Sequence, residues 1–275
     1  MRGASVAEAL DSAAVAIGAS GSPSPRLDAE LLLAETVGTG REALVTGPGR
    51  ELTAEQARRF RELVTRRSRD REPVAYLVGR KGFRWIELEV DPRVLVPRPE
   101  TELLVEAALG LPEGARVLDV GTGSGAVALA LKQERPDLDV VGSDISAEAL
   151  EVAAANRDRL GLPVGLEQGP VGLGHVRGIG QDRVPVAAQA LEEVGLLEPD
   201  LGHEPAGALF GGPDGLGVIR RLLPAAAATR ARLLAVEVGA GQAGGVATLA
   251  AAAGFTGVET VPDLVGIDRL VLASR

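Results

Sequence analysis

The sequence predicts an α/β protein with a Rossmann-like, mostly parallel sheet of seven strands, preceded by a small helical domain. Residues 117–125 have the pattern of a short buried strand that runs into a glycine-rich turn, and a helix follows at once, from about Ala126 to Glu134. Residues 140–144 give a second strand pattern, which ends in the acid Asp144. Helical periodicity without strand patterns in the first 72 residues indicates the separate helical domain.

Residues 1–72 are expected to fold as a helical domain of their own. Apolar residues recur at helical spacing, and turns rich in glycine and proline separate the helices. Thr53 is placed to cap the last helix. The predicted helices cover residues 5–19, 25–37, 41–45 and 52–71. A domain this small and rich in alanine is expected to dock on the next domain or on a partner.

The last of these helices carries a row of arginines. They are Arg58, Arg59, Arg61, Arg66, Arg67, Arg69 and Arg71. One interpretation is a solvated helix face, and the other is a docking surface for an acidic or RNA-rich partner. The sequence leaves both open.

Residues 73–96 are predicted to be a linker that contains a β-hairpin. A short helix is followed by two strand patterns with a turn at Asp91-Pro92, and these elements cover residues 72–79, 83–90 and 94–96. Pro97 and Pro99 then fix a loop just before a helix over 101–109. That loop either serves only to start the helix or closes over a cofactor pocket.

The C-terminal part continues the alternation of helices and strands. Its predicted elements are a helix over 216–228, a strand over 231–238, a helix over 244–253 and strands over 255–261 and 269–273. Because no helix separates the last two strands, we expect them to pair antiparallel.

The glycine turn indicates what kind of ligand the sheet would bind. Gly121, Gly123 and Ala126 fit the dinucleotide pattern G-x-G-x-x-A, so NAD is one candidate. Asp119, at the carboxyl end of the first strand, would repel a pyrophosphate but suits a cation. S-adenosylmethionine has a sulfonium and an ammonium group and no phosphate, so Asp119 favours it over NAD. Asp144 is placed to bind two ribose hydroxyls.

Composition limits the remaining possibilities. A net charge of −9 argues against a general nucleic-acid binder. The absence of cysteine excludes disulfides and thiolate chemistry, and two histidines do not build a metal site. No apolar run reaches the ~18 residues of a membrane span, and the N-terminus lacks a signal-peptide pattern. We therefore expect a cytoplasmic protein without a metal, a membrane anchor or direct nucleic-acid binding. We also expect it to act as a monomer.

Four segments together resemble the HemK-type protein-glutamine methyltransferases. They are residues 71–79, the stretch 94–102 with its Pro-Arg-Pro-Glu-Thr-Glu, the turn 119–125, and residues 204–216. The resemblance covers nearly the whole chain, and the stretch 94–102 is its most specific part. It implies transfer of a methyl group from S-adenosylmethionine to the glutamine side chain in the Gly-Gly-Gln loop of peptide chain release factors.

The resemblance also implies how the chain is divided. Residues 1–72 would recognise the substrate, and residues 97–275 would be a class I methyltransferase domain that binds S-adenosylmethionine. The candidate cofactor-binding residues are Asp119, Gly121, Thr122, Gly123, Ser124, Gly125, Asp144 and Ile145. Of these, the resemblance itself assigns residues 121–125 and Asp144.

The sequence departs from the family where the chemistry is expected. The family places an Asn-Pro-Pro-Tyr motif at the end of its fourth strand to hold the substrate amide, and this chain has none. Its only asparagine is Asn156 and its only tyrosine is Tyr76, so no catalytic residue is assigned. Pro170 replaces an acid expected near the adenine. From Pro170 to about Gly195 the match is lost, and residues 171–183 have no clean run for a central buried strand.

Intact flanks and retained length around this segment suggest two compensating reading-frame shifts in the gene. True divergence of the site is the alternative. Within the segment, His175 and Asp182 have the chemistry of an acid–base pair, but we interpret their proximity as chance. Three functions stay open: an active enzyme of this family, a non-catalytic homologue that binds the partner with or without the cofactor, and an NAD-dependent oxidoreductase.

Overall fold

The computed structural model describes residues 5–47, 49–169, 184–189, 202–205, 208, 212, 214–229 and 231–275. For residues 184–189 only the backbone is described. Contacts divide the chain into two compact units. One comprises Met1–Arg80 and Glu198–His203, and the other comprises Lys81–Leu197 and Glu204–Arg275.

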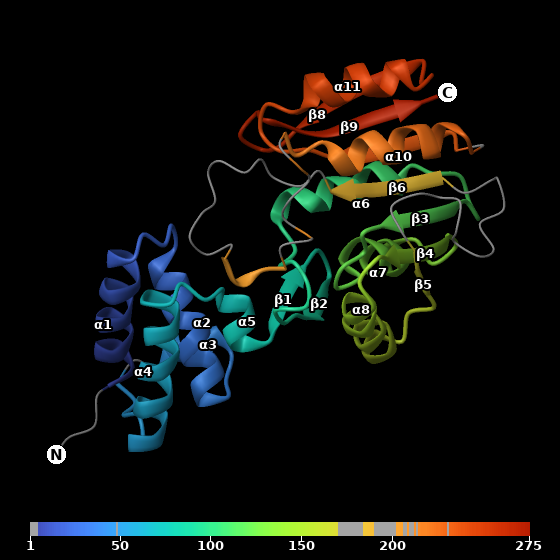
Figure 1. The fold of residues 1–275 in the computed structure, drawn as a ribbon. Coiled ribbons are helices and arrows are strands. Elements are labelled where there is room, and N and C mark those ends of the chain that lie inside the picture. The colour runs from blue at the N-terminus through green and yellow to red at the C-terminus, as the bar shows by residue number, and fades with distance from the viewer. Residues whose placement is uncertain are drawn as a thin grey trace. The chain divides into compact units, whose positions relative to one another are not determined.

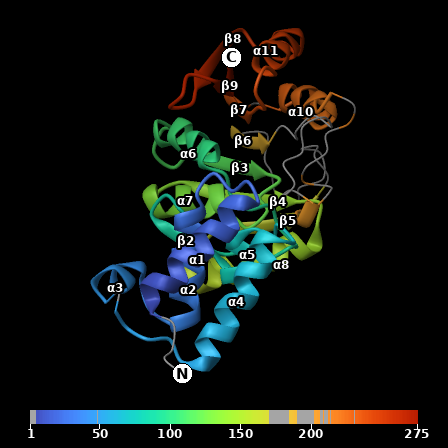
Figure 2. The same ribbon diagram turned by 90° about the vertical axis from the view of Figure 1, so that its left-hand side faces the viewer.

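The first unit is built from helices, as the periodicity predicts. They are α1 (Val6–Ala19), α2 (Pro25–Val37), α3 (Arg41–Thr46), α4 (Ala54–Ser68) and α5 (Val74–Val78). Capping boxes begin two of them, with Ser5 at α1 and Thr53 at α4, which confirms the predicted role of Thr53. Helices α1, α2 and α4 pack against one another (Figure 2) around a core that includes Leu10, Leu32 and Phe60.

The arginine row on α4 does not form a uniform solvated face. Arg67 is buried and forms an ion pair with Asp28 of α2 at 2.9 Å, where both side chains are less than one-tenth exposed. Arg66 pairs with Glu72 at 2.6 Å. Part of the row therefore holds the helical unit together, while Arg58, Arg61 and Arg69 are exposed.

The predicted β-hairpin is present but its position was wrong. Its strands are β1 (Arg80–Phe83) and β2 (Ile86–Glu89), and the chain turns at Arg84 rather than at Asp91-Pro92. Arg84 adopts a φ of 47°, a conformation that is usual for glycine or asparagine but uncommon for arginine. The sequence therefore did not indicate a turn at this position. Its guanidinium pairs with Glu134 at 2.5 Å, and this tertiary contact stabilises the turn. Residues 94–96 form no strand, although Val94 and Val96 are buried.

The second unit is organised around a seven-stranded sheet in the order β5-β4-β3-β6-β7-β9-β8 (Figure 1 and Figure 2). After η1 (Pro99–Thr101) and α6 (Glu102–Leu109), strands and helices alternate along the chain. The elements are β3 (Arg116–Val120), α7 (Ala126–Glu134), β4 (Asp139–Asp144), α8 (Ala147–Leu160), β5 (Gly165–Gln168), β6 (Val184–Gln189), α10 (Gly217–Ala227), β7 (Leu233–Glu237), α11 (Ala243–Ala252), β8 (Gly257–Pro262) and β9 (Asp268–Ser274).

The pairing of these strands confirms the predicted topology. The strands from β5 to β7 pair in parallel, and β9 pairs antiparallel with both β7 and β8. Because βαβ crossovers carry the chain back over the sheet, the carboxyl ends of β3 and β4 meet at one edge. This edge is where Asp119 and Asp144 lie.

Residues 171–183, where we expect no clean central strand, lie outside the described residues, and a central strand follows them. Strand β6 lies between β3 and β7, with Val184 paired to Val117 and Val186 paired to Ala235. Its β-branched residues directly follow the glycine-rich stretch, and it pairs in parallel with a strand on each side. Pro185 cannot donate to the ladder, and the register with β7 shifts between Val186 and Gln189.

Strand β3 is buried on both faces. Leu118 and Val120 belong to the same apolar cluster as residues of α10 and α11, including Ile219, Leu222 and Val246. Alternate residues of a strand point to opposite faces, so Asp119 lies on the face away from this cluster. Within the described part of the chain, no helix is long and apolar enough to cross a membrane.

Candidate active site

The glycine turn after β3 depends on backbone conformations that favour glycine. Gly121, Gly123 and Gly125 have φ values of 77°, 54° and 84°. A Cβ atom on Gly125 would lie 2.8 Å from the Leu129 side chain, whereas one on Gly121 or Gly123 would meet nothing within 4 Å. The lack of a Cβ atom on Gly125 therefore leaves room for the Leu129 side chain of α7, and the other two glycines have open space beside them.

Asp144 ties the glycine turn to the end of β4. One of its carboxylate oxygens accepts a hydrogen bond from the backbone N–H of Gly123, and the other accepts one from the backbone N–H of Ser146, each at 2.9 Å. Each carboxylate oxygen has two lone pairs, so the group can accept further hydrogen bonds from a ligand. Ser146 also caps α8 through Ala149, which fixes the loop that carries Asp144.

Asp119 is a buried carboxyl group at the end of β3, with a residue exposure of 2%. Its Oδ2 atom accepts hydrogen bonds from the Thr122 hydroxyl at 2.6 Å and from the Ala128 backbone N–H at 3.2 Å. Burial raises the pKa of Asp119 to about 7, although these two hydrogen bonds oppose the shift. A ligand cation beside this group would favour its ionised form.

A pocket joins these groups within the second unit. Seven of the eight predicted site residues line it, namely Asp119, Gly121, Thr122, Gly123, Ser124, Asp144 and Ile145. Gly125 is not part of the lining, and its Cα faces the side chains of Leu129 and Ala153. The loop before α6 contributes Pro97 and Thr101, which supports the interpretation in which this loop closes over a pocket.

The prediction from sequence missed the other walls of the pocket. They include Arg93, Val94, Leu95, Leu104, Ala149, Pro205, Ala208 and Val218. Several of these residues lie in the Pro-Arg-Pro stretch and near Glu204, within segments that the resemblance had already marked. That these two segments form one wall of the pocket could not be inferred from the sequence, because they are about a hundred positions apart in the chain.

Arg98 and Glu204 show how the two segments meet. Both carboxylate oxygens of Glu204 accept hydrogen bonds from the same Arg98 nitrogen, at 2.9 and 3.0 Å. The Glu204 side chain is 2% exposed and that of Arg98 is 37% exposed. Because Pro97 and Pro205 are their chain neighbours and line the pocket, this ion pair holds two pocket walls together.

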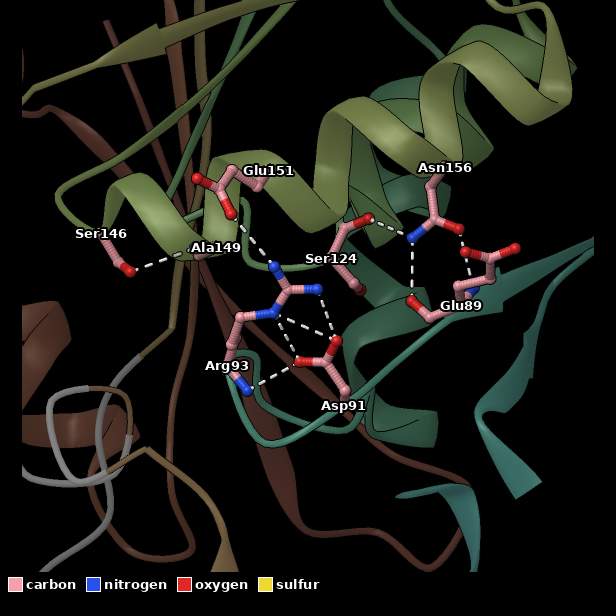
Figure 3. Close-up of polar contacts among 8 residues, drawn as sticks. All are labelled: Glu89, Asp91, Arg93, Ser124, Ser146, Ala149, Glu151 and Asn156. Atoms are coloured by element: carbon pink, nitrogen blue, oxygen red, sulfur yellow. Dashed lines mark hydrogen bonds and ion pairs between the residues drawn. The ribbon is translucent and has the colours of Figure 1, made fainter. Parts of the chain in front are cut away.

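The charges of the lining fit a cationic ligand without phosphate. Two acids, Asp119 and Asp144, face the pocket, and Arg93 is the only basic residue among the described lining residues. The Arg93 guanidinium is already bound by Asp91, at distances from 2.6 to 3.1 Å, and by Glu151 at 3.1 Å (Figure 3). A pyrophosphate would therefore meet repulsion rather than donors, apart from the turn's backbone N–H groups.

No histidine is among the described residues that line the pocket. His203 is half-buried, and its Nε2 lies 2.6 Å from the Asp70 carbonyl oxygen within the first unit. His175 and Asp182 lie outside the described residues. In the part of the chain that the structure describes, no cluster of three or more His, Asp or Glu residues is arranged to hold a metal ion.

Comparison with known proteins identifies the family. The chain is 41% identical to the release factor glutamine methyltransferase of Caulobacter vibrioides over 91% of its own length and 90% of the relative. It is also 41% identical to that of Neisseria gonorrhoeae, covering 90% of this chain and 93% of the relative. The protein of the same name in Moorella thermoacetica is 39% identical over 98% of both chains.

The chain belongs to the release factor glutamine methyltransferase family. Two family descriptions match parts of it: a PrmC N-terminal domain over residues 8–79 and a methyltransferase domain over residues 111–173. The second match contains every predicted cofactor-binding residue of this methyltransferase, from Asp119 to Ile145. It ends inside the segment where the sequence departs from the family's motifs.

Proposed function

We propose that this methyltransferase transfers a methyl group from S-adenosylmethionine to the glutamine side-chain nitrogen in the Gly-Gly-Gln loop of a peptide chain release factor. The observation that carries the proposal is a pocket with two acids and one engaged arginine, in a chain 41% identical to release factor glutamine methyltransferases. The proposed setting is the cytoplasm, where the protein would act as a monomer without contacting nucleic acid. We propose that residues 8–79 contribute to recognition of the release factor.

Two acids of the pocket support S-adenosylmethionine as the ligand. Asp144 keeps free acceptor capacity for ribose hydroxyls, since only one hydrogen bond to each of its oxygens is described. Asp119 supplies negative charge for a cationic group, and the open space over Gly121 and Gly123 lets a ligand approach the backbone. When bound, S-adenosylmethionine supplies an electrophilic methyl group on its sulfonium. The protein's contribution would then be orientation of the two reactants.

The test is methyl transfer by this chain. Purified protein is incubated with S-adenosylmethionine labelled in its methyl group and with a bacterial release factor, and the label on the release factor is measured. A release factor with Gln→Ala in its Gly-Gly-Gln loop is the control, and it should remain unlabelled. If the unchanged release factor and its Gln→Ala control are both labelled, the proposed substrate site is contradicted. The same holds if neither is labelled although the enzyme binds the cofactor.

A second candidate is cofactor binding without transfer. It is favoured by one observation, the absence of the Asn-Pro-Pro-Tyr motif, together with the structural use of Asn156, whose amide binds the carbonyl oxygens of Glu89 and Ser124. Calorimetric binding of S-adenosylmethionine without labelling of the release factor would support it. Translating the gene in its other two reading frames addresses the cause, since an Asn-Pro-Pro-Tyr there would indicate compensating frame shifts. The acidic pocket and the family together disfavour the NAD alternative.

A further inference from the structure

Asn156 occupies an unusual place in the second unit. It is the only asparagine of the chain and lies fully buried on α8. Its Nδ2 donates to the carbonyl oxygens of Glu89 at 2.9 Å and Ser124 at 3.1 Å (Figure 3). Its Oδ1 accepts from the Glu89 N–H at 2.7 Å and from the Arg159 guanidinium at 3.1 Å. An amide side chain has two donor hydrogens and two lone pairs on oxygen, so its hydrogen-bonding capacity is filled.

The two bonds to Glu89 complete the end of the hairpin. Glu89 is the last residue of β2, and its N–H and C=O both bind the same amide. This exchange imitates one rung of an antiparallel ladder and satisfies backbone groups that would otherwise need another partner. Asn156 thereby attaches the hairpin to α8.

The bond to Ser124 reaches the pocket itself. Ser124 lines the pocket, and its two neighbours in the chain, Gly123 and Gly125, both have positive φ values. Glycine restricts the backbone little, so the orientation of this turn depends on hydrogen bonds to its peptide groups. The Gly123 N–H is held by Asp144 and the Gly125 N–H by the Thr122 carbonyl at 2.8 Å, while the Ser124 carbonyl is held by Asn156.

Helix α8 also holds a second lining segment. Arg93 lines the pocket and forms an ion pair with Glu151, one helical turn or so before Asn156, at 3.1 Å (Figure 3). The Arg93 guanidinium also donates hydrogen bonds to both carboxylate oxygens of Asp91, which lies two residues beyond Glu89. The stretch that leads from β2 to the Pro-Arg-Pro loop is therefore fixed to the helix that also orients the glycine turn.

We propose that Asn156 is a positioning residue of the cofactor pocket, which fixes the Ser124 carbonyl and couples the glycine turn to the end of the hairpin at Glu89. The inference rests on the proposed use of S-adenosylmethionine. It gives the chain's only asparagine a role distinct from holding the substrate amide. The proposal also implies that a ligand in the pocket stabilises the hydrogen bond from the Glu89 N–H to Asn156. Glu89 itself is not among the described residues that line the pocket.

The first test compares Asn156→Asp with Arg84→Met. The aspartate keeps the shape and one acceptor, but it places a carboxylate oxygen against the carbonyls of Glu89 and Ser124. Arg84→Met removes a half-buried anchor of the same hairpin, and Arg84 is not among the described pocket-lining residues. Affinity for S-adenosylmethionine is measured by calorimetry on folded protein. Urea unfolding midpoints and the backbone amide signals of Gly123 and Gly125 are recorded alongside.

We expect Asn156→Asp to weaken cofactor binding by at least about tenfold, the scale of one lost buried hydrogen bond. It should also shift the two glycine signals. Arg84→Met should lower the unfolding midpoint but change the affinity less than about twofold. If Asn156→Asp binds like the wild type, or if affinity falls in both variants in proportion to lost stability, the positioning role is wrong.

A second test uses the wild-type chain and does not depend on any variant folding. Hydrogen exchange of the Glu89 amide is measured with and without saturating S-adenosylmethionine. Slower exchange with the cofactor supports the coupling through Asn156, and unchanged exchange overturns it. A wild-type chain that binds no S-adenosylmethionine overturns the proposed cofactor itself. Wild-type binding with an unchanged variant affinity and unchanged exchange overturns only the role of Asn156.

Discussion

Asp119 is the residue whose ionisation departs furthest from ordinary behaviour among those that line the pocket. Burial raises its pKa from 3.8 to about 7. Between these values the unfolded chain has lost the proton and the folded chain retains it. Stability in the absence of ligand therefore falls as pH rises through this window, and this contribution is constant above it.

Replacing Asp119 by asparagine should stabilise the ligand-free chain progressively as pH rises. The asparagine side chain cannot ionise, so the difference between variant and wild type in the free energy of unfolding should grow by about 2–3 kcal/mol between pH 5 and pH 7. Urea unfolding at the two pH values measures it. A difference that is the same at both values would show that Asp119 titrates normally.

Cofactor affinity should depend on the same ionisation with the opposite sign. A cationic ligand prefers the ionised carboxylate, so the affinity of the wild type for S-adenosylmethionine should rise as pH increases towards 7 and then level off. The limiting slope below the pKa is about tenfold per pH unit. In Asp119→Asn this dependence should be lost and the affinity at pH 8 reduced. Calorimetry from pH 6 to pH 8 provides the measurement.

At the scale of elements, the loop before α6 and the segment at Glu204 act together because of one ion pair. The Glu204 carboxylate is almost fully buried, so its attraction to Arg98 is weakly screened. The proline on each segment restricts the backbone beside the charged residue. The ion pair therefore determines how two pocket walls face each other.

Breaking the Arg98–Glu204 pair from one side should cost more than removing it entirely. Arg98→Met takes away a partner of a buried carboxylate and should destabilise the fold by about 3 kcal/mol. The double variant Arg98→Met with Glu204→Gln should recover part of that loss. Thermal unfolding and cofactor affinity of the single and double variants form the cycle. Strictly additive effects would indicate that the two side chains are not coupled.

At the scale of the whole molecule, the chain is two units with separate cores. The core of the helical unit includes Ile17, Leu33 and Leu63, and the sheet unit has its own cluster around Leu118 and Leu222. The pocket with the predicted site residues lies entirely in the second unit. A ligand in it should therefore stabilise that unit directly.

Calorimetric unfolding should resolve this organisation. S-adenosylmethionine should raise the transition of the sheet unit, because it binds only the folded pocket. Asp28→Asn should lower the free energy of unfolding of the helical unit by about 3 kcal/mol, because it breaks the buried pair with Arg67. The transition of that unit should therefore move to a lower temperature. A single transition that the ligand raises and that Asp28→Asn lowers would show that the two units unfold together.

The sequence by itself determined the alternation of helices and strands, the glycine turn and its two acids. These features are local, because strand periodicity, left-handed glycines and an acid at a strand end are properties of a few consecutive residues. The antiparallel final pair also followed, since no helix lies between the last two strands. The resemblance gave the family, which the relatives confirm.

Only the tertiary structure decided where the hairpin turns, where the central strand lies and what Asn156 does. Arg84 turns the hairpin with a contact to Glu134, fifty positions away in the chain. Strand β6 is defined by neighbours on both sides rather than by its own pattern. Asn156 joins groups 67 and 32 positions away. Burial and pairing between distant residues set all three, and no local pattern encodes which distant groups will meet.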